Sequence, residues 1–117
     1  SVVVVSTPPP KRDDHVRVAL RRERYFLDQA AAAGVDIDEI PLTAEPDRLA
    51  MWYLLQDMLR EHALAGGAAF LRVPSDALDS EGFLRPDFSR WDVTHANPRF
   101  GQLLWAALEN EIEGEQP

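Results

Sequence analysis

The run of four valines at residues 2–5 limits the possible folds more than any other feature of this sequence. All four side chains are β-branched and no polar residue alternates with them, which is typical of a strand buried on both faces in a parallel sheet. The prolines at residues 8–10 end this strand, because proline fixes φ and has no N–H to donate. A second apolar run at residues 68–73, closed by Pro74, predicts a second strand.

Helical periodicity separates the two predicted strands. Apolar residues recur at helical spacing over residues 14–33, and Gly34 is placed to end that helix. A second helix is predicted at about residues 45–65, where Gly66 stops it. Its apolar residues are spread over more than one face, so we expect this helix to be well buried. Residues 35–42 form the connector between the two helices.

The part of the chain after the second strand predicts a long surface loop and a final helix. Residues 75–90 are rich in turn-forming residues, and loops of this length in compact domains are often functional. Asn97 and Pro98 provide a helix cap and a first-turn proline, and the acidic residues from Glu109 are expected to fray. The resulting order, β-α-α-β-loop-α, predicts an α/β fold with parallel strands and helices on the faces of the sheet.

Two strands buried on both sides make too small a sheet to be stable alone. The missing neighbours are expected to come from an N-terminal half, a second chain or a partner subunit. The chain also opens with Ser1 rather than methionine and enters a strand at once, which suggests a piece of something longer. We therefore expect residues 1–117 to be the C-terminal part of a single domain.

Composition excludes several classes of function. The 117 residues carry a formal net charge of −8, with 20 acidic and 12 basic side chains, which disfavours binding to nucleic acid or to an anionic membrane surface. There is no cysteine, so disulfides and thiolate chemistry are excluded and a cytoplasmic location is the expectation. No segment approaches the roughly 18 consecutive apolar residues of a membrane span.

For two of the three histidines, His15 and His62, the sequence indicates neither a catalytic nor a metal-binding role. His15 lies in the first turn of a predicted helix beside Asp13 and Asp14, where we expect an exposed, partly charge-compensated side chain. His62 follows Glu61 inside the second helix, but no second histidine lies four residues away, so a metalloprotease helix is not indicated.

His95 differs from these because of its neighbours. It follows Asp92 by three residues, in a loop after the second strand and directly before a capped helix. At this spacing the carboxylate can accept a hydrogen bond from imidazole Nδ1, which leaves Nε2 free to take a proton. Trp91 and Phe88 would then wall the site and exclude water. From the residues alone, His95 can be either a structural histidine of the turn or a catalytic one, and both interpretations stay open.

The string Asp-Val-Thr-His-Ala-Asn at residues 92–97, with Gly101 and a helix after it, resembles the last conserved block of the SGNH (GDSL-type) hydrolases. The strand at residues 2–6 resembles the one that follows that family's Gly-x-Asn-Asp block, and residues 68–73 resemble the strand before its Asp-x-x-His loop. Ala96 departs from the family's usual proline. The resemblance implies a three-layer α/β/α flavodoxin-like sandwich with a parallel sheet, to which this chain contributes the C-terminal part.

The resemblance also implies a chemistry. His95 would be the general base of a serine esterase or acyltransferase, Asp92 would orient it, and the substrate would be a small-molecule or carbohydrate acyl ester, with no cofactor. The chain lacks the Gly-Asp-Ser block, the oxyanion-hole glycine block and the Gly-x-Asn-Asp block. None of its serines has the required context: Ser1, Ser6, Ser75, Ser80 and Ser89. The nucleophile must then come from an N-terminal portion or a second chain.

Three other interpretations stay open. Asp92 and His95 would supply only two metal ligands, and no third is evident, so a metal site is not predicted. A non-catalytic α/β interaction domain would use the pair as a structural turn bond. A helical binding module would pair through the helix at residues 45–65 and would not place residues 2–5 in a multi-stranded sheet. Within the loop at residues 75–90, three apolar side chains either contact substrate or seal the sheet edge, and we expect the second: Phe83, Leu84 and Phe88.

Overall fold

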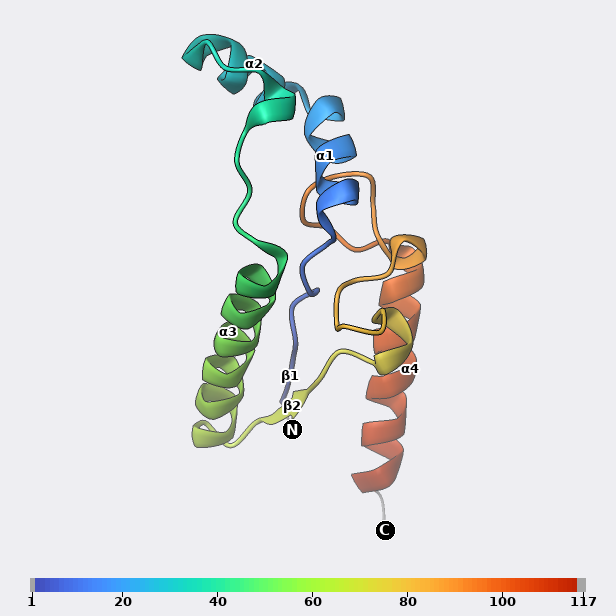
Figure 1. Cartoon of the computed structure of the whole chain (residues 1–117). Coiled ribbons are helices and arrows are strands. Elements are labelled where there is room, and N and C mark those ends of the chain that lie inside the picture. The colour runs from blue at the N-terminus through green and yellow to red at the C-terminus, as the bar shows by residue number, and fades with distance from the viewer. Residues whose placement is uncertain (1, 116–117) are drawn as a thin grey trace.

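The computed structural model describes residues 2–115 and shows a mixed helix and strand chain (Figure 1). The strands and helices, in chain order, are β1 (Val3–Val5), α1 (Asp13–Arg22), α2 (Arg24–Ala33), α3 (Glu45–Ala65), β2 (Ala69–Leu71) and α4 (Pro98–Glu115). Short 3₁₀ turns occur at Ile37–Glu39, Ser75–Ala77 and Pro86–Phe88.

The two strands pair in parallel, as the sequence predicted. Val3, Val4 and Val5 align with Ala69, Phe70 and Leu71 respectively, and Figure 1 shows the strand pair between α3 and α4. A mixed α/β chain with a parallel strand pair is therefore confirmed. The sheet formed by the described residues has two strands, and each strand is an edge strand.

The prediction that the valine strand is buried on both faces is wrong for this chain. Val3 and Val4 are half-buried, while Val5 is 42% exposed and Val2 is 66% exposed. The backbone pairing also leaves one edge of β1 open: Val2 accepts a hydrogen bond from Ala69 and Ser6 donates one to Leu71, so the backbone groups of Val3 and Val5 face away from β2. No described residue pairs with that edge.

The helix predicted at residues 14–33 is divided at Glu23 into α1 and α2. Glu23 adopts an extended backbone conformation, with φ −88° and ψ 113°, and its carboxylate accepts a hydrogen bond from Val93 N–H at 2.9 Å. Glu23 and Val93 are 70 residues apart in the sequence, so the local pattern of apolar residues did not indicate this break. Gly34 ends α2 in the left-handed conformation, as predicted. Figure 1 shows α2 at the end of the molecule away from the strand pair.

Helix α3 has the predicted bounds but not the predicted burial. Only Gln56 and Ala63 are buried within it, while Met51 and Leu54 are more than 60% exposed. The reason is that α3 packs on the strand pair with one face, and nothing in the described chain covers the opposite face.

Helix α4 begins where the sequence placed it and continues further than expected. Asn97 Oδ1 accepts from the backbone N–H of Phe100 at 3.2 Å, which caps the helix. The acidic residues from Glu109, where fraying was expected, lie within α4, which extends to Glu115. Trp105 Nε1 donates to Glu109 Oε1 at 2.7 Å across one helical turn, which supports this part of the helix.

The best-packed core lies beneath α4, away from the strand pair. Its buried members are Ala77, Leu84, Phe88 and Phe100, and Phe83 nearby is 2% exposed. The loop at residues 75–90 thus folds inward, and its apolar side chains are buried as expected, but Leu84 and Phe88 pack beneath α4 and do not seal the sheet edge.

The chain is elongated rather than compact. Its radius of gyration is 16.8 Å and its extents are 61 × 27 × 25 Å, whereas a compact domain of this length has a radius of about 13 Å. An elongated chain covers less of its own apolar surface, which agrees with the exposed faces of β1 and α3.

We expect Phe100→Ala to destabilise the chain by about 3–5 kcal/mol, because it removes a fully packed aromatic ring from the core beneath α4. Tyr25→Ala is the matched control: this ring is 66% exposed on α2, and its loss should change stability by less than about 1 kcal/mol. Urea unfolding monitored by circular dichroism measures both. Equal losses for the two variants would contradict the assignment of the core.

Candidate active site

The residues between Asp92 and His95 form a tight turn closed by one side chain. Asp92 Oδ1 accepts hydrogen bonds from the backbone N–H of Thr94 at 3.1 Å and of His95 at 2.7 Å. Aspartate favours this arrangement because its short side chain reaches the backbone two and three residues ahead. An antiparallel bridge between Ser89 and Ala96 closes the base of the turn.

The same carboxylate also binds the imidazole of His95. His95 Nδ1 lies 2.8 Å from Asp92 Oδ2, so the hydrogen bond predicted from the three-residue spacing is present. With Nδ1 donating to the carboxylate, the neutral ring carries its proton on Nδ1 and leaves the Nε2 lone pair free. The His95 side chain is 75% exposed, so Nε2 is accessible to a group that approaches from outside.

A buried lysine lies on the other side of Asp92. Lys11 is 2% exposed, and its Nζ donates to the backbone carbonyls of Arg90 at 2.7 Å and of Asp92 at 2.8 Å, and to Asp92 Oδ1 at 3.2 Å. This residue was not predicted from the sequence. A signal was present, since Lys11 is the only lysine of the chain and directly follows the proline run.

His15 is also part of this arrangement, and the prediction that it is exposed is wrong. It is 6% exposed, its Nε2 donates to the Arg90 carbonyl at 2.9 Å, and its ring stacks on Trp91 with centroids 4.4 Å apart. The reason is that α1 packs its buried face against the loop at residues 90–93. Trp91 is 52% exposed and stacks on His15, and Phe88 lies in the core, so neither forms the predicted wall around His95.

The start and end of α1 therefore hold the loop that leads into the turn. Lys11 and His15 both donate to the Arg90 carbonyl, and Glu23 accepts from the Val93 N–H. These long-range contacts fix the backbone on the N-terminal side of the turn, while α4 fixes the C-terminal side.

The electrostatics of the pair follow from these contacts. Burial by itself would raise the pKa of the Asp92 carboxyl, but hydrogen bonds from the His95 N–H, the His95 ring and Lys11 lower that pKa to about 2. Burial lowers the pKa of the Lys11 ammonium, and the adjacent Asp92 carboxylate partly opposes this effect. Asp92 therefore stays ionised at neutral pH and can stabilise a charged imidazole.

The described serines are placed elsewhere. Ser6 is buried and donates to Gln56 Oε1 at 2.6 Å, and Ser89 is buried and donates to the Arg85 carbonyl at 3.1 Å. Ser75 and Ser80 are exposed, and Ser1 lies outside the described residues. No hydrogen bond joins a described serine to His95, in agreement with the prediction that none is the nucleophile. His62 is exposed near the end of α3, as expected for an ordinary helix residue.

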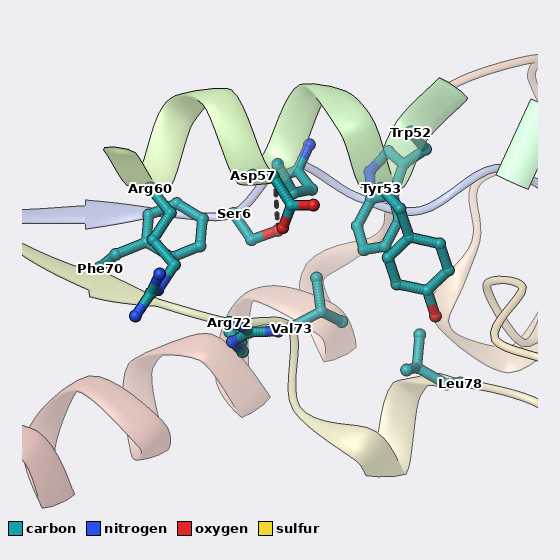
Figure 2. Close-up of a pocket in the computed structure, with 10 residues that line it drawn as sticks. Ser6, Trp52, Tyr53, Asp57, Arg60, Phe70, Arg72, Val73 and Leu78 are labelled. Carbon is teal, nitrogen blue, oxygen red and sulfur yellow. Dashed lines mark hydrogen bonds between the residues drawn. The ribbon is translucent and has the colours of Figure 1, made fainter. Parts of the chain in front are cut away.

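Two hollows in the surface differ in their relation to the turn. One of about 190 Å³ lies between α3 and the end of β2, where Figure 2 shows Arg60, Arg72 and Tyr53 around it; His95 does not line it. The other, of about 460 Å³, includes Val93 and Thr94 of the turn in its wall. Its remaining lining comes mainly from the proline run, the connector between α2 and α3, and Trp52. The second hollow is thus next to the turn, although neither Asp92 nor His95 lines it.

None of the described helices has the length and apolar character needed to cross a membrane. The described residues also contain no group of three or more histidine, aspartate or glutamate side chains arranged to hold a metal ion.

The low pKa of Asp92 predicts a pH-dependent stability. In the folded chain this pKa is about 2, below the ordinary value of 3.8. The ionised carboxylate therefore adds its full contribution to the free energy of unfolding above about pH 4, and this contribution is lost as the pH falls towards 2. We expect the stability difference between the chain and its Asp92→Asn variant to shrink by about 2 kcal/mol between about pH 5 and pH 2. Urea unfolding at each pH measures this difference. A constant difference would show that Asp92 is not held in its ionised form.

Comparisons of the sequence and the fold with protein-family models, curated proteins and solved structures found no match. Function is therefore inferred from the Asp92–His95 turn and the surfaces around it.

Proposed function

We propose that this chain is the C-terminal part of an SGNH-type serine ester hydrolase or acyltransferase, in which His95 is the general base and Asp92 its orienting partner. The observation that carries this proposal is the 2.8 Å hydrogen bond from His95 Nδ1 to Asp92 Oδ2, on a histidine whose side chain is 75% exposed. A histidine arranged in this way has the tautomer that a base needs and the access that a nucleophile requires.

In the proposed mechanism, Nε2 of His95 takes the proton of a serine hydroxyl as that hydroxyl attacks an acyl ester carbonyl. The imidazolium that forms is stabilised by the Asp92 carboxylate, which remains ionised because its pKa is about 2. His95 then returns the proton to the leaving alkoxide. Donors to the oxyanion, which typically contribute a few kcal/mol each, would come with the serine from residues outside this chain.

The architecture supports completion of the sheet by other residues. The outer edge of β1 presents the backbone groups of Val3 and Val5, and Val5 is 42% exposed although its β-branched side chain suits a buried strand. In the proposed three-layer α/β/α sandwich, further parallel strands from an N-terminal portion or a second chain would cover this edge. The nucleophilic serine would be carried by that added part.

The hollow beside the turn is the proposed place for the substrate. Prolines 8–10 and Leu42 give it a rigid apolar wall, while Thr43 and Thr94 supply hydroxyls. Such a lining suits the acyl group and the adjacent polar atoms of a small-molecule or carbohydrate ester. The acidic net charge of −8 and the absence of cysteine are in keeping with a cytoplasmic enzyme that binds neither nucleic acid nor anionic membranes.

A second candidate is a non-catalytic interaction domain. It is favoured by the exposed apolar stripe on the outer face of α3, formed by Met51, Leu54, Leu55 and Met58. In that case the Asp92–His95 hydrogen bond would serve only to close the turn before α4. Dependence of ester hydrolysis on His95 separates the two candidates.

The 117-residue chain alone should not hydrolyse a p-nitrophenyl ester, because it has no nucleophile in the required place. In the protein completed by the part that carries the serine, His95→Ala should lower kcat by at least about 1000-fold and leave the fold intact, since this side chain is mostly exposed. Steady-state hydrolysis and circular dichroism measure the two effects.

His62→Ala is the matched control, because this histidine is exposed on α3, and its activity should equal that of the unchanged protein. Full activity of His95→Ala in the completed protein would remove the catalytic assignment. Turnover by the 117-residue chain that depends on His95 would instead overturn the proposal that the nucleophile lies elsewhere.

A further inference from the structure

The chain uses its one lysine at a buried position and arginine for every other basic side chain except histidine. Lys11 is among the most completely buried large side chains, and its ammonium has three acceptors within 3.2 Å for its three N–H donors. A compact ammonium can direct three hydrogen bonds to converging acceptors in a small space, whereas a planar guanidinium cannot. The geometry therefore specifies lysine at this position.

The acceptors of Lys11 are the backbone and side chain that set the catalytic pair. The ammonium binds the carbonyls of Arg90 and Asp92 and the Oδ1 atom of the Asp92 carboxylate. With Oδ1 held by Lys11 and the turn N–H groups, the carboxylate plane is fixed and Oδ2 is directed at His95 Nδ1. His95 and Lys11 thus bind opposite ends of one carboxylate.

We propose that Lys11 is a positioning residue that fixes the tautomer of His95 by holding the Asp92 carboxylate. The consequence for catalysis rests on the proposed function, but the effect on the tautomer does not. Without the ammonium, only the turn N–H groups still donate to Oδ1, so the carboxylate is held less firmly. The Asp92 carbonyl loses its donor, and the Arg90 carbonyl keeps only His15. His95 then populates the tautomer protonated on Nε2, and in that form the atom facing a nucleophile cannot accept its proton.

The positive charge of Lys11 helps to lower the pKa of Asp92, but it is not what directs the carboxylate at the His95 ring. A second cation on Asp92 competes with the imidazolium for the same carboxylate and so weakens its stabilisation. Geometry and charge therefore predict different results for Lys11→Arg. If hydrogen-bond geometry matters, arginine should not restore the Nδ1-protonated form; if charge alone matters, it should.

Nitrogen NMR of the ¹⁵N-histidine-labelled 117-residue chain tests the tautomer directly, with the His95 signal assigned from the His95→Ala variant. The unchanged chain should show neutral His95 protonated mainly on Nδ1. Lys11→Met, which keeps the side-chain length and removes the donors, should shift the population towards Nε2 protonation, and Lys11→Arg should do the same. Unchanged Nδ1 protonation in Lys11→Met, or its restoration by arginine, would overturn the proposal.

Arg24→Met is the matched control, because it also replaces a cation by methionine but at a side chain that is 88% exposed and, among residues 2–115, forms an ion pair only with Asp28 one helical turn away. Its His95 tautomer should equal that of the unchanged chain. A shift of the same size in Arg24→Met would count against a specific role for Lys11.

A second measurement needs no variant and stays valid if Lys11→Met does not fold. Labelling with ¹⁵N-lysine gives a single side-chain signal, since the chain has one lysine. A buried ammonium with three acceptors should exchange its protons slowly and remain visible at neutral pH. Loss of the signal through rapid exchange with solvent would show that the ammonium is not held, and the proposal would fall.

The catalytic consequence is measured in the completed enzyme. Lys11→Met should lower kcat on the order of tenfold to a hundredfold with little change in KM, because the defect lies in the base and not in substrate binding. A tautomer shift together with hydrolysis that does not depend on His95 would refute the proposed function while leaving the positioning role standing. A normal kcat in Lys11→Met would refute the positioning role in catalysis.

Discussion

The buried ammonium of Lys11 is the interaction on which the candidate site depends. It joins the segment that follows β1 to the carbonyls of Arg90 and Asp92, about 80 residues later in the sequence. A buried cation is tolerated only when its donors are satisfied, so the loop must close around it in one arrangement. His15 and Glu23 add contacts to the same loop, and α1 thereby becomes the support for the Asp92–His95 turn.

A second constraint is the size of the sheet. The two strands share one row of hydrogen bonds and leave two open edges. Helices packed on the faces of the sheet do not pair with the backbone groups at these edges, whereas further strands would. The elongated shape of the chain agrees with this small sheet. The local turn that holds His95 does not depend on the sheet, because its contacts come from α1, α4 and the loop itself and not from the open strand edges.

Local interactions were readable from the sequence. The Asp92 carboxylate reaches the N–H groups and the ring of a histidine three residues ahead, and that geometry depends on nothing outside the turn. Gly34 ends α2 and Asn97 caps α4 for similarly local reasons. The two parallel strands and the bounds of α3 were predicted from hydrophobic runs and from the glycines and prolines that end them.

The sequence by itself thus determined the elements and the Asp92–His95 pair, because both arise from contacts within a few residues. Only the tertiary structure decided the break of the first helix at Glu23, the burial of His15 and the role of Lys11, since each depends on partners about 70 to 80 residues away. A pattern of apolar residues does not specify which distant carbonyl a side chain will meet. For the same reason, the periodicity of α3 gave its bounds but not its exposed face, which depends on what packs against it.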